Sequence, residues 1–311
     1  MPSQSSAAML QCGGFRLPGA GTLVMAIVNL TADSFSGDGL AGDPVRAVAY
    51  ARRQIEAGAD LLDIGAESSR PGAVPVSVDE ELRLLLPVLD ALAGCGVPIS
   101  VDTYKPRVMR AALAHGASMI NDIYALRMPG ALAAVADSDC AICLMHMQGD
   151  PSSMQENPVY SDVLDEVRCF LRERVAAASE AGIARERLLL DPGFGFGKTV
   201  QHNLELLRRL EQLSMEGLPV LAGLSRKSML GAVTARSVED RVAGSIAAAL
   251  LAAQRGARIL RVHDVAQTRD ALAVWHAVES QGERSTEIEM PSFRDSKRIE
   301  PAEGRYLQAF R

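Results

Sequence analysis

The stretch from residue 97 to residue 122 reads Val97-Pro-Ile-Ser-Val-Asp-Thr-Tyr-Lys-Pro-Arg-Val-Met-Arg-Ala-Ala-Leu-Ala-His-Gly-Ala-Ser-Met-Ile-Asn-Asp122. Residues 97–102 and 118–122 are short apolar runs typical of buried strands, and residues 105–115 between them carry apolar side chains at helical spacing. Each run ends in polar residues. A strand, a helix and a second strand form the unit from which parallel sheets are built, so the fold depends on whether this unit repeats.

The unit recurs along the whole chain. We expect strands at 23–29, 60–64, 97–102, 118–122, 140–146, 187–191, 218–224 and 258–262, and helices near 43–58, 78–93, 105–115, 129–137, 159–182, 200–213, 238–255 and 265–279. The strands show almost no polar alternation, as expected for a parallel sheet that is buried on both faces. Eight such units predict an α/β protein with a (β/α)8 TIM barrel. An open doubly wound sheet is the alternative, because sequence does not show strand order.

The two ends of the chain fall outside this repeat. Residues 1–22 contain three glycines and a proline between positions 13 and 19, which favour a short hairpin that plugs the bottom of the barrel. Residues 281–311 mix charges with few large apolar side chains and predict a mobile polar tail. Since no linker interrupts residues 23–280, we expect that segment to form one barrel domain.

Composition excludes several classes of protein. The chain has 311 residues, of which 48% are apolar, so it can bury a large core. Its 32 Lys and Arg against 38 Asp and Glu give a net charge of −6, which argues against a nucleic-acid partner. The longest weakly polar stretch, 242–253, is too short to span a membrane, and residues 1–11 lack the features of a secretory signal. We therefore expect a cytoplasmic protein without a membrane partner.

The five cysteines are an odd, scattered set, which favours reduced thiols. Cys140 and Cys143 are the closest pair, but they lie three residues apart on an expected strand and would face opposite sides of the sheet. A redox or zinc role for this pair is therefore not expected.

Polar residues interrupt the expected strands almost entirely at their C-terminal ends, which in a parallel barrel meet at one mouth. A buried polar group left unpaired costs about 1–3 kcal/mol, so this concentration indicates a ligand. Carboxylates and an amide suit a flat heterocycle with several N–H donors, a lysine can bind a ring carbonyl, and an arginine can stack on a ring or bind phosphate oxygens. The end residues are Asn29, Asp63, Asp102, Asn121, Asp122, His146, Asp191, Ser225, Arg226, Lys227, Arg261 and His263.

The segment Gly193-Phe-Gly-Phe-Gly-Lys-Thr199 has the glycine content of a phosphate-binding loop but not its pattern. A P-loop needs glycine where this chain has Pro192, which has a fixed φ and no N–H to offer an anion. We predict instead a tight turn that brings backbone close to Asp191. The loops at 30–43 and 65–77 are long and rich in hydroxyl side chains and glycine, so we expect them to be lids.

Taken together, these strand ends resemble those of the dihydropteroate synthases over roughly residues 23–280. The resemblance rests on eight motifs that occur in the order of that family: Met25-Ala-Ile-Val-Asn-Leu-Thr-Ala-Asp-Ser-Phe-Ser36, Asp63-Ile-Gly-Ala-Glu-Ser-Ser-Arg-Pro-Gly72, Ser100-Val-Asp-Thr-Tyr-Lys-Pro106, Ile120-Asn-Asp-Ile123, Met145-His-Met-Gln148, Leu190-Asp-Pro-Gly-Phe-Gly-Phe-Gly-Lys198, Leu224-Ser-Arg-Lys-Ser228 and Arg261-Val-His263.

The resemblance implies an enzyme that condenses 6-hydroxymethyl-7,8-dihydropterin pyrophosphate with 4-aminobenzoate by a dissociative substitution, with Mg²⁺ as cofactor and a homodimer as the assembly. It implies these roles: pterin binding by Asp102, Asn121, Asp191 and Lys227, stacking by Arg261, Mg²⁺ binding by Asn29, pyrophosphate contacts by Asn29, Arg261 and His263, a substrate contact by Phe196, and a second loop with Ser69 and Arg70. The implied catalytic set is Asp102, Arg261, His263, Ser69, Arg70 and Lys227.

This chain departs from the family at three places. Ser69 stands where the family usually has Thr, Ala32 replaces a usual Pro, and residues 37–39 rearrange a glycine-rich sequence. Two other functions share the pterin pocket: methyl transfer from a folate to a corrinoid, and pterin binding without catalysis. Both loops keep their hydroxyls, and Asn29 and Arg70 are present, which favours the synthase.

Overall fold

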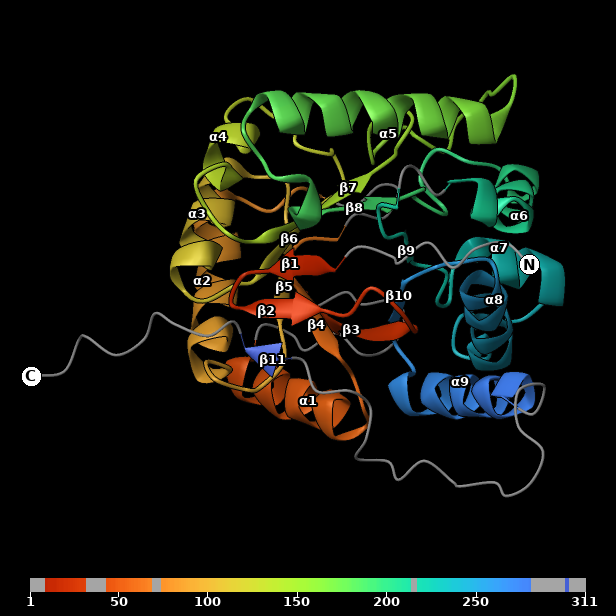
Figure 1. Ribbon diagram of the computed structural model, residues 1–311, viewed down its shortest axis with the longest axis horizontal. Helices are drawn as coiled ribbons and strands as arrows, with labels where there is room; N and C mark the ends of the chain where they lie inside the picture. Colours follow the sequence, from red (N-terminus) through yellow and green to blue (C-terminus); the bar gives the residue numbers. More distant parts are fainter. Residues whose placement is uncertain (1–8, 32–42, 69–73, 214–216, 281–299, 302–311) are drawn as a thin grey trace, which may run out of the picture.

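The computed structural model describes residues 9–31, 43–68, 74–213, 217–280 and 300–301 (Figure 1). Within these ranges, eight parallel strands form one sheet in the order β8-β7-β6-β5-β4-β3-β10-β9. The strands are β3 (Leu23–Asn29), β4 (Leu61–Gly65), β5 (Ile99–Asp102), β6 (Met119–Asp122), β7 (Ala141–Met145), β8 (Leu188–Asp191), β9 (Leu221–Ala222) and β10 (Ile259–Val262).

The two ends of this strand order meet, so the sheet is closed into a barrel. Leu190 on β8 forms a parallel bridge with Val220, which precedes β9, and the Leu190 N–H donates to the carbonyl of Pro219 at 2.9 Å. Strand order never reverses along the sheet, so the predicted TIM barrel is confirmed and the doubly wound alternative is wrong.

Strand register sets the positions of the polar end residues. Asn29 pairs with Gly65, Gly65 pairs with Asp102, and Asp102 pairs with Asn121. On the other side of the barrel, Met145 pairs with Asp191. Because parallel strands in register end at the same edge, these residues share one end of the barrel.

Helices surround the barrel (Figure 1). The α-helices are α1 (Pro44–Glu56), α2 (Val78–Ala91), α3 (Pro106–Ala114), α4 (Ala131–Val135), α5 (Val163–Glu180), α6 (Val200–Arg208), α7 (Ser228–Thr234), α8 (Val242–Gln254) and α9 (Val265–Ser280), with short 3₁₀ turns at Arg185–Arg187 and Leu210–Leu213. Four of the helices begin at a side chain that accepts a backbone N–H of the first turn: Asp43, Ser77, Asp162 and Thr199. None of the described helices is long and apolar enough to cross a membrane.

Several sequence expectations differ from the structure. The strand expected at 218–224 comprises only Leu221–Ala222, and the helix expected near 238–255 begins only at Val242. The helix expected near 159–182 begins only at Val163, because Asp162 caps it. The expected helix at 200–213 ends at Arg208 and continues as a 3₁₀ turn. Helix α7 was not expected: it is only seven residues long and ends at Ala235 with φ of 56°, so it is too short to show a helical period.

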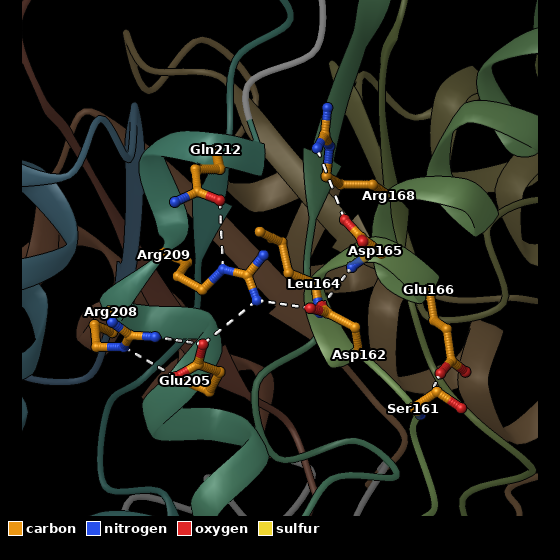
Figure 2. A network of polar contacts seen from close by, with 10 residues as sticks. All are labelled: Ser161, Asp162, Leu164, Asp165, Glu166, Arg168, Glu205, Arg208, Arg209 and Gln212. Carbon is orange, nitrogen blue, oxygen red and sulfur yellow. Dashed lines mark hydrogen bonds and ion pairs between the residues drawn. The ribbon is translucent and has the colours of Figure 1, made fainter.

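The surface of the helix ring includes a network of ion pairs between α5 and α6 (Figure 2). Arg209 lies 2.9 Å from Asp162 and 3.4 Å from Glu205, and Arg208 lies 2.6 Å from Glu205. Exposed pairs of this kind typically contribute less than about 1 kcal/mol each. The fold therefore depends mainly on the apolar layer between strands and helices.

The N-terminal segment forms a hairpin of β1 (Leu10–Cys12) and β2 (Phe15–Leu17). Leu10, Cys12 and Leu17 are buried against side chains at the starts of the barrel strands, among them Leu23, Leu61, Met119, Ala141, Leu189, Leu221 and Ile259. The hairpin therefore closes the N-terminal end of the barrel interior. A two-residue strand, β11 (Glu300–Pro301), pairs with β2. Most of residues 281–311 lie outside the described part, so the division into hairpin, barrel and tail stays a prediction.

All five cysteines are free. Cys140 packs in the layer between strands and helices, whereas Cys143 faces the barrel interior, so the two point to opposite sides as expected.

Candidate active site

A charge cluster that is partly exposed to solvent occupies the C-terminal mouth of the barrel. Arg261 on β10 pairs through Nε with Asp63 Oδ2 on β4 at 2.6 Å and through Nη2 with Asp102 Oδ2 on β5 at 3.0 Å. Asn121 on β6 donates from Nδ2 to the same Asp63 oxygen at 3.2 Å. Four strands thus place one guanidinium, two carboxylates and one amide in direct contact.

Burial sets the charge states of this cluster. Burial raises the pKa of Asp102 to about 7, Arg261 opposes that shift, and the neighbouring Asp63 adds to it. For Arg261, burial alone would lower the pKa, but Asp63 and Asp102 outweigh it and raise the pKa above its usual range. Arg261 is therefore a permanent cation, while Asp102 changes its charge near neutral pH.

Asp191 lies at the end of β8, where it orders the glycine-rich turn after it. Its Oδ1 accepts the N–H of Gly193 at 2.7 Å. Burial raises its pKa, partly offset by that N–H and by Lys227, Lys198 and Arg261. Asp191 therefore lies within electrostatic range of Arg261.

The turn at 192–198 is tight, as the sequence predicts. A Cβ at Gly193, whose φ is +67°, would lie 1.9 Å from the carbonyl oxygen of His146. Lys198 Nζ ties the turn together by donating to the carbonyls of Gly193 and Phe196, each at 3.0 Å, and it lies 2.9 Å from His146 Nδ1. Burial and then Lys198 lower the pKa of His146 to about 2, so this imidazole is neutral.

Lys227 reaches the same turn from the loop between β9 and α7. Its Nζ donates to the Phe194 carbonyl and lies 4.2 Å from the centre of the Phe196 ring. The preceding residue, Arg226, has φ of 57° and is held by an ion pair with Asp264 at 2.7 Å. The loops after β9 and β10 therefore fix the position of Lys227 together.

His263, two residues after Arg261, is oriented by Ser225. The Ser225 hydroxyl accepts the backbone N–H of His263 at 3.2 Å and lies 2.9 Å from His263 Nδ1. This contact fixes the orientation of the imidazole ring.

The structure brings most of the sequence-predicted residues into two adjoining groups. Arg261 contacts Asp102 directly and is linked to Asn121 through Asp63, and Asp191 and Lys227 contact the glycine-rich turn that contains Phe196. Asn29 is half-buried at the end of β3, in register with this edge. Ser69, Arg70, Ala32 and residues 37–39 lie outside the described residues.

Sequence reasoning did not assign roles to several residues that shape this mouth. Asp63 was recognised as a strand-end residue, yet its ion pair with Arg261 joins β4 and β10, which are far apart in sequence. Lys198 was recognised only as part of a motif. The signal that could have identified Lys198 is its place directly after glycines at every second position. A tight turn of this kind points backbone carbonyls toward its own interior, where the lysine ammonium can bind them.

A pocket of about 290 Å³ opens beside Asp102. Its lining is acidic and aromatic and comes from four strand-end loops and from α2; it includes Glu67, Glu81, Tyr104, Tyr124 and Asp150. Among the described residues, no three His, Cys, Asp or Glu side chains are grouped so as to hold a metal ion.

Comparison with known proteins agrees with this geometry. Residues 25–263 match the model of the pterin binding enzyme family. Dihydropteroate synthase of Escherichia coli strain K12 is 50% identical over 261 residues, which cover 84% of this chain and 93% of that protein. Two solved structures each cover 88% of this chain with a TM-score of 0.81. They are Burkholderia cenocepacia dihydropteroate synthase with 7,8-dihydropteroate, 51% identical over 98% of its length, and the Xanthomonas albilineans enzyme with 4-aminobenzoic acid, 54% identical over 99%.

The match spans every strand of the barrel and the whole of the charged mouth, and it covers nearly the full length of each relative. The chain belongs to the pterin binding enzyme family and, within it, to the dihydropteroate synthases.

Proposed function

We propose that the mouth of the barrel joins 6-hydroxymethyl-7,8-dihydropterin pyrophosphate to 4-aminobenzoate, giving 7,8-dihydropteroate and pyrophosphate. The observation that carries this proposal is the contact between Asp63, Asp102, Asn121 and Arg261, at the same barrel end as Asp191. The two relatives with bound 7,8-dihydropteroate and 4-aminobenzoic acid support these small molecules as product and substrate.

The pterin ring is held by Asp102, Asn121, Asp191 and Lys227 in this proposal. The Oδ1 of Asn121 is buried and has no hydrogen-bond partner among the described residues. A buried acceptor in that state costs about 1–3 kcal/mol, which a ring N–H donor would recover. The ammonium of Lys227 binds the ring carbonyl, and the planar guanidinium of Arg261 stacks on the ring.

The pyrophosphate faces Asn29, Arg261 and His263. The Asn29 amide oxygen fits Mg²⁺, which binds oxygen ligands, keeps several waters and is held in part by substrate phosphates. Mg²⁺ bound there would neutralise charge on the leaving pyrophosphate. Arg261, a permanent cation, and His263, oriented by Ser225, contribute donors from the protein.

The substitution proceeds by dissociation. The bond between the methylene carbon and the pyrophosphate oxygen breaks, and its electron pair leaves with pyrophosphate. Positive charge on the methylene carbon spreads into the dihydropterin, where the carboxylates of Asp102 and Asp191 stabilise it. The amine nitrogen of 4-aminobenzoate then donates its lone pair to that carbon and loses a proton. Ser69 and Arg70 of the second loop act in excluding water from the cation until the amine arrives.

The assembly we propose is a homodimer located in the cytoplasm. Val233 on α7, Leu251 on α8 and Val274 on α9 are large apolar side chains that are exposed in the single chain. Exposed apolar side chains on neighbouring helices are typical of a subunit interface. Light scattering after gel filtration checks this: a mass near 33.1 kDa would contradict the dimer.

The direct test of function is an assay with pterin pyrophosphate, labelled 4-aminobenzoate and Mg²⁺. We expect 7,8-dihydropteroate to form. Asp191→Ala should weaken binding of the pterin by about 10- to 150-fold, the value of one charge-assisted hydrogen bond, in a calorimetric titration. Asp79→Ala, which removes an exposed carboxylate on α2, is the matched control and should bind like the parent. Absence of labelled product with the parent protein would refute the proposed reaction, and pterin binding without product would indicate a non-catalytic binding protein.

A further inference from the structure

We propose that Lys198 is a positioning residue for pterin binding, because it holds two neighbours that hydrogen-bond Asp191. The inference rests on the proposed function, in which Asp191 binds the pterin ring. Lys198 stands at the end of the glycine-rich turn that follows Asp191, and it is 3% exposed. The two neighbours are Gly193, within the turn, and His146, directly after β7.

Gly193 links the lysine to the carboxylate of Asp191. Its N–H donates to Asp191 Oδ1 at 2.7 Å. Its carbonyl accepts Lys198 Nζ at 3.0 Å. The peptide groups on the two sides of one glycine therefore bind the two charged side chains, and movement of this glycine away from Lys198 would also move the donor that orients Asp191.

His146 links the lysine to the main chain of Asp191. The backbone N–H of His146 donates to the Asp191 carbonyl at 2.9 Å. Lys198 Nζ lies 2.9 Å from His146 Nδ1 and 3.4 Å from the His146 carbonyl oxygen. Lys198 thus contacts one partner of the Asp191 side chain and one partner of its backbone.

The surroundings of Nζ hold the lysine in one place. A further contact, to the Phe196 carbonyl at 3.0 Å, brings its described partners to three carbonyl oxygens and the imidazole nitrogen of a neutral His146. All of these are acceptors, so only the N–H groups of Lys198 satisfy them. Methionine at this position would leave them unpaired in a buried place.

Charge couples Lys198 to Asp191 as well. Burial lowers the pKa of Lys198 well below its ordinary value, and Asp191 opposes that shift. Burial raises the pKa of Asp191, and Lys198 is among the groups that oppose this rise. Each side chain therefore favours the charged form of the other, in addition to the contacts that run through Gly193 and His146.

Arg187 provides the matched control, because it is a buried cation that binds backbone carbonyls at the other end of β8. It comes directly before that strand and is 5% exposed. Its guanidinium donates to the carbonyls of Val135, Ala136 and Cys140 at 2.7, 3.0 and 2.8 Å. Loss of Arg187 should lower stability without disturbing the mouth, whereas loss of Lys198 should affect both.

The experiment compares Lys198→Met, Lys198→Gln and Arg187→Met with the parent. Methionine lacks the N–H donors, and glutamine keeps an N–H donor on a shorter side chain. The two Lys198 substitutions are also made together with Asp191→Ala, which is measured alone too. For each folded variant, calorimetric titration gives the Kd for 6-hydroxymethyl-7,8-dihydropterin, and thermal unfolding gives the melting temperature.

We expect Lys198→Met to weaken pterin binding by about tenfold or more, of the order of one hydrogen bond to a charged group, and Lys198→Gln to recover part of this loss. Arg187→Met should lower the melting temperature and leave the pterin Kd within about twofold of the parent. In the Asp191→Ala background, Lys198→Met should weaken binding by less than about twofold further, because the lysine acts through Asp191. If Lys198→Met does not fold, Lys198→Gln provides the same comparison.

Two results would overturn the inference: a pterin Kd within about twofold of the parent in the folded Lys198 variants, or effects of the Lys198 and Asp191 substitutions that simply multiply. A lysine that only stabilised the fold would give the second result.

Hydrogen exchange of the Gly193 amide gives a readout that needs no ligand. Faster exchange in Lys198→Met than in both the parent and Arg187→Met supports the positioning role, and equal exchange in all three contradicts it. If the parent binds no pterin, the proposed function fails, and this exchange measurement still decides the inference.

Discussion

A buried carboxylate, Asp63, and a half-buried one, Asp102, hold Arg261 at the mouth of the barrel, and Arg261 thereby connects strands that are nearly 200 residues apart in sequence. Asp63 contacts it at 2.6 Å and Asp102 at 3.0 Å. A buried ion pair with satisfied hydrogen bonds adds little net stability, but removal of one partner leaves a charge uncompensated. The cluster is therefore better explained by ligand binding than by stability.

The charge of Asp102 gives a pH dependence that can be measured. Its pKa is raised to about 7, so below that pH the carboxylate is protonated and cannot accept a ring N–H. We expect pterin affinity to rise with pH up to about 7, by at most about tenfold per pH unit, and then to level off. Calorimetric titration between pH 5.5 and 8.5 checks this. Asp102→Asn should remove the dependence, and a flat profile in the parent would contradict the assignment.

The raised pKa of Asp102 also makes the free energy of unfolding depend on pH, and this dependence has the opposite sign to that of pterin binding. Because the folded-state pKa of Asp102 lies above its ordinary value of about 3.9, the folded protein binds more protons than the unfolded chain between those two values. The contribution of Asp102 to the free energy of unfolding therefore falls as pH rises from about 4 to 7 and is constant above 7. Ligand binding and stability thus respond oppositely to pH at this residue.

Among the elements, the turn at 192–198 shapes the part of the mouth that we propose binds the pterin ring. It carries Asp191 into position through the Gly193 N–H, and it presents the Phe194 carbonyl to Lys227. Glycine is required at position 193 for two independent reasons, a φ of +67° and the close approach of the His146 carbonyl. Either reason alone would make a side chain costly there.

Gly193→Ala tests this turn against a matched control. Gly116 also has a positive φ, +89°, but a Cβ there would meet nothing within 4 Å. Gly116→Ala should therefore cost only about 1 kcal/mol of backbone strain. Gly193→Ala should cost about 1–3 kcal/mol more, because the added carbon displaces the chain at His146. Urea denaturation of both variants measures the difference, and equal losses would contradict the steric argument.

For the whole molecule, closure of the barrel requires both a continuous ring of strands and a filled interior. The bridge between Leu190 and Val220 completes the ring, and the β1–β2 hairpin covers the end of the interior that lies away from the site. The hairpin that fills the barrel interior and the proposed active site thus lie at opposite ends of the barrel, as is usual for this fold.

Leu17→Ala tests that separation. Leu17 is 1% exposed and packs on the barrel interior, so its truncation should lower the free energy of unfolding by about 2–5 kcal/mol. At a temperature where the variant is folded, kcat and both KM values should match the parent. Met9→Ala, at an exposed neighbouring position, should change stability by less than about 0.5 kcal/mol. A change in KM for either substrate would show that the hairpin influences the mouth.

The sequence alone determined the eight strand–helix units and the barrel, because short buried apolar runs and helical spacing are local properties of the chain. It also identified Asp102, Asn121, Asp191, Lys227 and Arg261 as residues of one mouth, since the carboxyl ends of parallel strands must meet. Local pattern could not resolve the seven-residue helix α7, which is too short to show a period. Contacts between units were decided only by the tertiary structure: the ion pair of Arg261 with Asp63, the ion pair of Lys105 with Glu67, and the hydrogen bonds of Lys198 to the carbonyls of its turn. Each depends on distances across the closed barrel or within a folded loop, which residue spacing along the chain does not encode.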